Sequence, residues 1–285
     1  YDVVIAGGVE MMSLVPMRIN RMGKDNEGSR FHARYPDGMI RQGISAERIA
    51  ARWRVSRAEQ DAFSLRSHKR AAADDGAAHD IVAIDVDTAA GTRTVAKDEG
   101  VRADSTLEKL ASLKPAFEDA AMAARYPEIA WSVTAGNASQ VTDGASAMLI
   151  VEEQVAHALG LTPRAAITHF AVAGDDPIMM LTAIMPATRK LLARAGLGIE
   201  AIDAYEVNEA FASVPLMWSK EMQVGQDRLN VNGGAVALGH PLGASGARIM
   251  TTLVHELARR RARYGLQAIC CAGGLATASI IERVG

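Results

Sequence analysis

The sequence predicts an α/β protein, and three features of its 285 residues indicate that class. Short apolar runs alternate with helical patterns, an order that gives a doubly wound sheet with helices on both faces. The alternation is clearest in the second half, where glycine-rich turns separate the elements. The composition, 49% hydrophobic and 22% charged residues, is that of a chain with a sizeable core and excludes a disordered protein.

The first half predicts fewer regular elements. Residues 1–6 are expected to form a buried strand closed by Gly7 and Gly8, and residues 13–43 a long loop. A short helix is expected over 45–53, and capping boxes at Ser56 and Ser105 should each begin another helix, the first running to about residue 73. A further short strand is expected over 81–86, and apolar runs at 131–134 and 147–151 flank a turn of small residues at 135–139. Because residue 1 already lies inside a strand, we expect the N-terminal part of the domain to be missing from this chain.

The second half predicts a regular succession of strands and helices. Gly196 should end one helix, and an apolar stripe at Met250, Leu253, Val254 and Leu257 predicts a long amphipathic helix. The strands are expected over 165–172, 201–207, 268–271 and 276–282, and the helices over 185–195, 209–222 and 244–263. Residues 161–164 look like a linker, so we expect two lobes, 1–162 and 163–285.

Charge, hydropathy and cysteine content exclude several classes of function. The 31 basic and 33 acidic residues give a net charge of −2, which excludes nucleic-acid binding driven by bulk charge. No apolar run approaches the roughly 18–20 residues that span a bilayer. The two cysteines, Cys270 and Cys271, are adjacent, so they predict neither a disulfide framework nor a metal site. A protein of a reducing, cytoplasmic compartment is expected.

Three short segments carry candidate chemistry. His240 lies among four glycines and a proline just before the long helix, where a rigid turn could present it as a general base or hydrogen-bond donor. Cys270 ends a strand and is followed by glycines, which would offer a thiol beside free backbone N–H groups, although a free cysteine is as often a plain core residue. Asn208 stands at a strand-to-helix junction, where it could hold a water or a substrate carbonyl, or cap the helix.

These segments, in this order and at these distances, resemble those of the thiolases, the acyl-CoA:acetyl-CoA C-acyltransferases. The matching blocks span the chain: residues 5–13 (IAGGVEMMS), 42–47 (QGISAE), 134–144 (TAGNASQVTDG), 208–212 (NEAFA), 239–241 (GHP) and 270–274 (CCAGG). The resemblance implies a layered α-β-α-β-α fold with mixed five-stranded sheets. It also implies an incomplete N-terminal lobe and a helical loop domain inserted at about 20–130.

The resemblance also implies a reaction, the reversible thiolytic cleavage or Claisen condensation of a 3-ketoacyl-CoA with CoA or acetyl-CoA. His240 matches the histidine that activates a nucleophilic cysteine and donates to the thioester oxygen, Asn208 the residue that holds a water beside it, and Cys270 the acid/base at C2. The backbone N–H of Ala272 would complete a second oxyanion hole. The matching nucleophilic cysteine lies upstream of Tyr1, so the 285 residues alone are expected to be inactive.

Other positions are expected to contact the substrate. Arg102 matches a basic residue near the nucleotide end of CoA, His169 stands where many members have a serine that touches the pantetheine, and Ala210 and Phe211 would line the acyl and pantetheine tunnel. The resemblance implies CoA as substrate, neither a metal nor a tightly bound cofactor, a role in fatty acid metabolism such as beta-oxidation, and a homodimer or homotetramer. Neither nucleic acid nor membrane is an expected partner.

Two rival interpretations remain open at this stage. A β-ketoacyl synthase shares the fold but carries a second histidine where this chain has Asn208, and an asparagine rather than a cysteine near the last glycines, so Asn208 and Cys270 favour a thiolase. A non-catalytic thiolase-like protein that binds acyl-CoA or lipid, or serves in assembly, would explain the missing nucleophile but has no need of Cys270.

Overall fold

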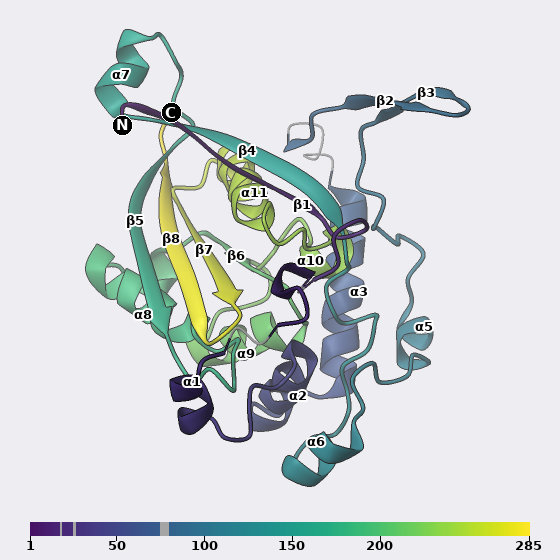
Figure 1. The fold of residues 1–285 in the computed structure, drawn as a ribbon. Coiled ribbons are helices and arrows are strands. Elements are labelled where there is room, and N and C mark those ends of the chain that lie inside the picture. The colour runs from purple at the N-terminus through teal and green to yellow at the C-terminus, as the bar shows by residue number, and fades with distance from the viewer. Residues whose placement is uncertain (18, 25–26, 75–79) are drawn as a thin grey trace.

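The computed structural model describes residues 1–17, 19–24, 27–74 and 80–285 and contains three sheets (Figure 1). The strands are β1 Val3–Met11, β2 Ile84–Thr88, β3 Gly91–Val95, β4 Asp143–Val151, β5 Ala165–Gly174, β6 Ala204–Val207, β7 Tyr264–Cys271 and β8 Leu275–Arg283. The helices are α1 Ser29–Arg34, α2 Gln42–Arg52, α3 Arg57–Ala73, α5 Leu107–Ala111, α6 Ala120–Arg125, α7 Glu153–Ala158, α8 Ile184–Ala195, α9 Ser213–Met222, α10 Ala235–Leu238 and α11 Ser245–Arg260, with 3-10 turns at Ile19–Arg21 and Ile199–Ala201.

The C-terminal sheet has the strand order β5-β8-β7-β6. Only the β6–β7 pair in it is parallel, because β7 and β8 form a hairpin through the tight turn at 272–274 and β8 then pairs antiparallel with β5. The mixed sheet implied by the resemblance is therefore present. In the described residues this sheet has four strands rather than five.

Helices cover both faces of the C-terminal sheet. Helix α8 packs on β5 and β8, and its left-handed Gly196 C-cap (φ 63°) ends it as predicted. Helix α11 packs between the opposite face and the β1–β4 ribbon, so the layers run α8, sheet, α11, ribbon (Figure 1). The predicted stripe of α11 is buried and forms a core cluster with Ile281. These are four of the five layers that the resemblance implies.

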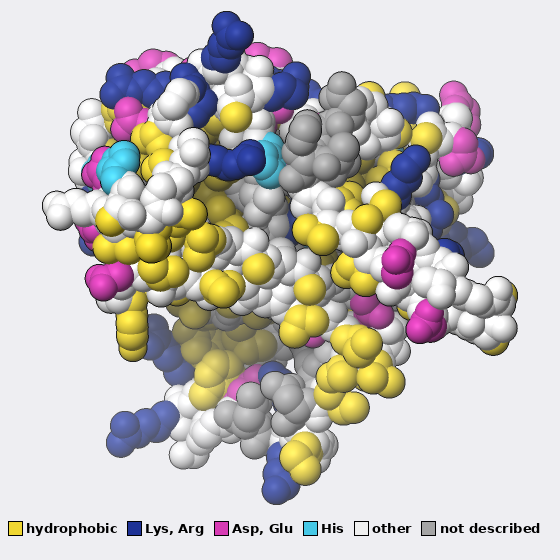
Figure 2. All heavy atoms as spheres, turned by 90° about the horizontal axis from the view of Figure 1, so that it is seen from above, with side chains coloured by type: hydrophobic (Ala, Val, Ile, Leu, Met, Phe, Trp, Pro, Cys, Tyr) yellow, Lys and Arg dark blue, Asp and Glu magenta, His cyan; other side chains and the backbone are white. Residues whose placement is uncertain are grey.

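The β1–β4 ribbon is exposed on its outer face, which contradicts the prediction of a buried N-terminal strand. Strand β1 runs on through Gly7 and Gly8 to Met11 and pairs antiparallel with β4. The inner side of the ribbon packs on the start of α11, where Ser146 Oγ of β4 donates to the Ala244 carbonyl at 2.6 Å. On the outer side Ile5 and Val9 are 74% and 72% exposed, and Leu149, opposite Ile5, is 57% exposed. Figure 2 shows hydrophobic side chains at the surface on the side where this ribbon lies in Figure 1.

We expect this apolar outer face to make the 285-residue chain self-associate, since contiguous exposed apolar surface favours association. Sedimentation velocity should show the mean mass rising with concentration, and the double variant Ile5→Lys, Leu149→Lys should lower both the association and the binding of a hydrophobic dye. Val86→Lys serves as the control, because Val86 is also exposed but lies in the β2–β3 hairpin, which is a separate sheet from the β1–β4 ribbon. A monomer at every concentration would contradict this expectation.

Local elements of residues 13–160 match the sequence unevenly. The capping box at Ser56 is present, with Ser56 Oγ accepting from the Glu59 N–H at 3.2 Å and Glu59 accepting from the Ser56 N–H at 2.7 Å. The second box is shifted, because Thr106 rather than Ser105 caps α5. The apolar run at 131–134 forms an irregular segment with φ 51° at Trp131. In residues 1–17, 19–24, 27–74 and 80–285, no helix combines the length and apolar character needed to cross a bilayer.

Candidate functional site

Asn208 directly follows β6, and the hydrogen bonds of β7 fix its position. Its backbone N–H donates to the Ala268 carbonyl at 3.0 Å, which extends the parallel β6–β7 pairing by one residue. Its side-chain Nδ2 lies 3.2 Å from His240 Nε2, and its buried Oδ1 has no partner among the described residues. Helix α9 begins only at Ser213 with Ala212 at its N-cap, so Asn208 does not cap the helix and its amide is directed to the histidine.

His240 lies in a turn whose preceding position, 239, requires glycine. Gly239 has φ +85°, and a Cβ there would lie 2.0 Å from Thr142 Oγ1. The His240 backbone N–H donates to the Gln140 carbonyl at 3.2 Å, and the ring Nδ1 lies 2.6 Å from Ser245 Oγ. Burial, with a smaller effect from the Arg248 charge, lowers the pKa of His240 to about 4. The imidazole is therefore neutral at pH 7 and available as a base.

The low pKa of His240 predicts a loss of stability in mild acid. Its pKa is about 4 when folded, against an ordinary 6.5 when unfolded, so the unfolded state alone binds the proton as the pH falls below 6.5. The free energy of unfolding should fall from pH 6.5 to pH 4 by about 3 kcal/mol from this group. Urea titrations across that range, compared with His240→Gln, measure the contribution. A His240 ring that titrates near pH 6.5 by NMR would contradict the prediction.

Glu209 and the residues around it hold the segment that carries Asn208. The Glu209 carboxylate is buried and accepts hydrogen bonds from Ser67 Oγ at 2.8 Å, Asn230 Nδ2 at 2.9 Å and the Val236 N–H at 3.0 Å. Burial raises the pKa of Glu209, although these three donors oppose the rise. Glu209 thus joins the end of β6 to α3 and to the segment before His240. The prediction missed this residue, whose position next to Asn208 was the only available signal.

The turn at 134–140 closes the site from the N-terminal half. Ala138 pairs with Phe211 in an antiparallel bridge, and the Ser139 N–H donates to the Ala210 carbonyl at 3.0 Å. Gln140 Nε2 donates to the carbonyls of residues 100, 236 and 237 at 2.9–3.1 Å, so it ties the loop after β3 to α10. The small residues of this turn were noted in the sequence, but Ser139 and Gln140 were not predicted as site residues.

Cys270 lies at the end of β7, two residues beyond the strand position that Asn208 joins. It is 8% exposed and belongs to the same core cluster as Ala210 and Phe211. Burial raises the pKa of its thiol to about 12. Cys271 next to it is exposed. The turn that follows places Ala272 at the surface and Gly273 and Gly274 at positive φ, 83° and 80°, conformations that favour glycine.

The two other predicted contact residues are Arg102 and His169. Arg102 is exposed, and its backbone N–H donates to His68 Nδ1 at 3.2 Å. His169 lies in the middle of β5 opposite Ile280, next to a break in the strand register, with a buried Nδ1 that has no partner in the described chain. A contact of either residue with CoA stays a prediction.

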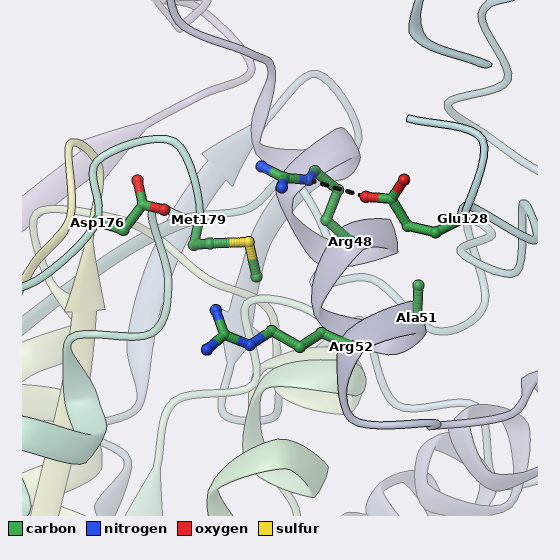
Figure 3. Close-up of a pocket in the computed structure, with 6 residues that line it drawn as sticks. All are labelled: Arg48, Ala51, Arg52, Glu128, Asp176 and Met179. Atoms are coloured by element: carbon green, nitrogen blue, oxygen red, sulfur yellow. Dashed lines mark hydrogen bonds and ion pairs between the residues drawn. The ribbon is translucent and has the colours of Figure 1, made fainter. Parts of the chain in front are cut away.

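A surface pocket of about 260 Å³ lies apart from these residues (Figure 3). It is lined by Arg48, Ala51, Arg52, Glu128, Asp176 and Met179. Arg48 spans it to Glu128 at 3.5 Å and stacks on the Tyr126 ring at 4.1 Å. The two positive charges of the lining, on Arg48 and Arg52, are matched in number by the acidic Glu128 and Asp176. None of the predicted site residues lines this pocket.

Comparison with protein families accounts for both halves of the chain. Residues 1–154 match the N-terminal domain of thiolase and residues 161–283 the C-terminal domain. The steroid 3-ketoacyl-CoA thiolase FadA6 of Mycobacterium tuberculosis is 43% identical over 99% of this chain, which covers 68% of that protein. An acetyl-CoA acetyltransferase of Escherichia coli is 40% identical over 99% of the chain, which covers 72% of it.

Solved structures agree with these relatives. Human mitochondrial 3-ketoacyl-CoA thiolase superposes with a TM-score of 0.85 at 37% identity, over 99% of this chain and 72% of its own. The acetyl-CoA acetyltransferase of Bacillus anthracis gives a TM-score of 0.84 at 39% identity, with the same coverage. The chain therefore belongs to the thiolase family.

Proposed function

We propose that the chain carries the acid/base half of a thiolase-type site, which cleaves a 3-ketoacyl-CoA with CoA or runs the reverse condensation. The observation that carries the proposal is the pairing of the Asn208 amide with the His240 imidazole at 3.2 Å, next to strand β7, whose last residue but one is the buried Cys270. An enolate next to a thioester needs positioned hydrogen-bond donors and a proton carrier at C2. CoA is a substrate in this chemistry and not a bound cofactor.

The protonation state of Cys270 gives it a definite role in cleavage. Because its pKa is raised to about 12, the resting group is a thiol and not a thiolate. During cleavage the thiolate sulfur of the acylatable thiol bonds to C3, the C2–C3 bond breaks, and its electron pair remains on C2 as the acetyl-CoA enolate. The Cys270 S–H bond then breaks, its proton goes to C2, and the sulfur keeps the electron pair. In condensation the thiolate takes that proton back.

His240 and Asn208 act on the oxygen and sulfur atoms of the reaction. The neutral imidazole takes the proton of an acylatable thiol, which becomes the nucleophile, and the resulting imidazolium donates a hydrogen bond to a thioester oxygen. The side-chain amide of Asn208 contacts the His240 ring and adds its own polar atoms to the site. The Ala272 N–H contributes to a second oxyanion hole, and Arg102, Ala210, Phe211 and His169 contact CoA. The acylatable thiol is neither Cys270 nor Cys271 in this assignment.

Exchange of the C2 protons of acetyl-CoA with D2O tests the assignment directly, because it needs the acid/base thiol but no acyl-enzyme. We expect Cys270→Ala to lower the exchange rate by about 10²-fold or more. Cys271→Ala is the matched control, since the neighbouring thiol is exposed and should leave the rate unchanged. Equal rates in the two variants would remove Cys270 from the reaction, whereas acetyl-CoA binding without exchange in the unmodified chain would favour a binding-only protein.

The pH dependence of this exchange gives a second, independent check. Exchange begins with removal of a C2 proton by the Cys270 thiolate, and with a thiol pKa of about 12 only a small fraction is ionised at neutral pH. The rate should therefore rise about tenfold per pH unit from pH 7 to 9. A plateau in this range would contradict a strongly raised pKa.

A cytoplasmic homodimer or homotetramer that acts in fatty acid metabolism stays a prediction, for which light scattering tests the assembly.

A further inference from the structure

The hydroxyl of Ser245 links His240 to the first turn of α11. Ser245 Oγ lies 2.6 Å from His240 Nδ1 and 2.9 Å from the Pro241 carbonyl oxygen, and the serine is 1% exposed. A carbonyl oxygen can only accept, so the single hydroxyl proton of Ser245 belongs to the bond with Pro241. Ser245 Oγ can then face the imidazole only as an acceptor, which places the ring proton on Nδ1.

The other side of the ring agrees with this placement. A neutral imidazole carries one proton, so a proton on Nδ1 leaves Nε2 as an acceptor. Asn208 Nδ2, at 3.2 Å, is a donor and matches that bare nitrogen. The network Asn208 to His240 to Ser245 to Pro241 therefore makes three hydrogen bonds that all run in one direction.

The opposite network makes fewer bonds. If Ser245 donated to Nδ1, the ring proton would sit on Nε2, and the Asn208 amide would have to turn its Oδ1 toward it. The Ser245 bond to Pro241 would then be lost, leaving two hydrogen bonds in place of three in a buried site. Hydrogen-bond satisfaction favours the first arrangement.

We propose that Ser245 is a positioning residue that fixes His240 as the Nδ1–H tautomer and so keeps Nε2 as the basic nitrogen of the site. In the reaction, Nε2 takes the proton of a thiol: the S–H bond breaks, the sulfur keeps the electron pair, and an Nε2–H bond forms. The Nδ1–H group stays hydrogen-bonded to Ser245 Oγ throughout, so the imidazolium keeps its orientation and can return the proton from Nε2. This catalytic role rests on the proposed function, but the tautomer does not.

NMR of the histidine ring nitrogens in the ¹⁵N-labelled chain tests the proposal without substrate. At pH 7.5 the two-bond proton–nitrogen pattern should show a protonated Nδ1 and an unprotonated Nε2 for His240. Ser245→Ala should shift the ring toward the Nε2–H form or to an averaged pattern, and Ser245→Thr, which keeps a hydroxyl, should restore the original one. Thr251→Ala is the matched control, because Thr251 Oγ1 makes the same kind of bond, to the Ala247 carbonyl at 2.9 Å, on the same helix.

The outcomes separate this proposal from the proposed function. An Nε2–H tautomer in the unmodified chain, or an unchanged Nδ1–H pattern in Ser245→Ala, overturns the role of Ser245 even if acetyl-CoA exchange is present. The predicted tautomer together with absent exchange would leave Ser245 in place and count against the reaction. If Ser245→Ala does not fold, the tautomer of the unmodified chain and that of Ser245→Thr still decide the question.

Discussion

Replacement of His240 by alanine is expected to lower the thiolysis of acetoacetyl-CoA by about 10²–10⁴-fold, in a version of the protein that includes the acylatable cysteine. The imidazole is neutral at pH 7 because its pKa is about 4, and its Nε2 is held by Asn208. Without it, the acylatable thiol loses its base and the thioester oxygen loses a donor. Both losses fall on the transition state rather than on CoA binding.

The measurement should separate kcat from substrate affinity. We expect kcat to fall while the affinity for CoA stays within about threefold, because the interactions lost form only as the bond breaks. His157→Ala is the control, since His157 is exposed on α7. Ping-pong kinetics should be seen in the unmodified enzyme, because an acyl-enzyme precedes the second substrate. A reduction of less than tenfold in His240→Ala would place the base elsewhere.

Gly8→Ala is expected to destabilise the protein by about 3 kcal/mol or more, the upper range for adding a methyl group to a tightly packed contact. A Cβ on Gly8 would lie 1.8 Å from the Gly243 carbonyl oxygen and 2.7 Å from its carbon, so the backbones must separate. Since Gly243 lies between His240 and Ser245, the separation should also disturb the histidine turn. Thermal unfolding and the His240 ring spectrum report the two effects.

Gly28→Ala provides the matched control for this substitution. A Cβ on Gly28 meets nothing within 4 Å, and its φ of −78° suits any residue, so its effect should stay within about 0.5 kcal/mol. Equal melting temperatures for the two alanine variants would show that β1 does not contact the turn closely. A stable Gly8→Ala with a disturbed His240 spectrum would instead place the whole effect in the site.

The sequence predicts elements well where one local rule decides. The apolar stripe of α11, the Ser56 capping box and the Gly196 C-cap are each contained in a few neighbouring residues, and all three are present. The β2–β3 hairpin was only half predicted, because its second strand, Gly91–Val95, is polar and exposed and has no alternating pattern. The burial of β1 was predicted wrongly because an apolar run does not show which layers cover it.

The candidate site shows the same limit. The order of Asn208, His240 and Cys270 suggested a common reaction through resemblance, and the hydrogen bond between Asn208 and His240 is consistent with it. The roles of Glu209 and Gln140 depend on contacts between segments far apart in the chain, up to 142 residues for Ser67 and Glu209. Such contacts follow from the tertiary fold and have no local signature.

The close packing of the N-terminal ribbon against the histidine turn has a practical consequence for dissecting the molecule. Glu10 accepts a hydrogen bond from the Gly243 N–H at 3.0 Å, and Ser146 donates to Ala244, so both strands of the ribbon grip the loop between His240 and α11. A C-terminal piece expressed by itself would contain every side chain assigned to proton transfer. It would nevertheless hold its imidazole loosely, because the scaffold that aims it is encoded more than ninety positions earlier in the chain.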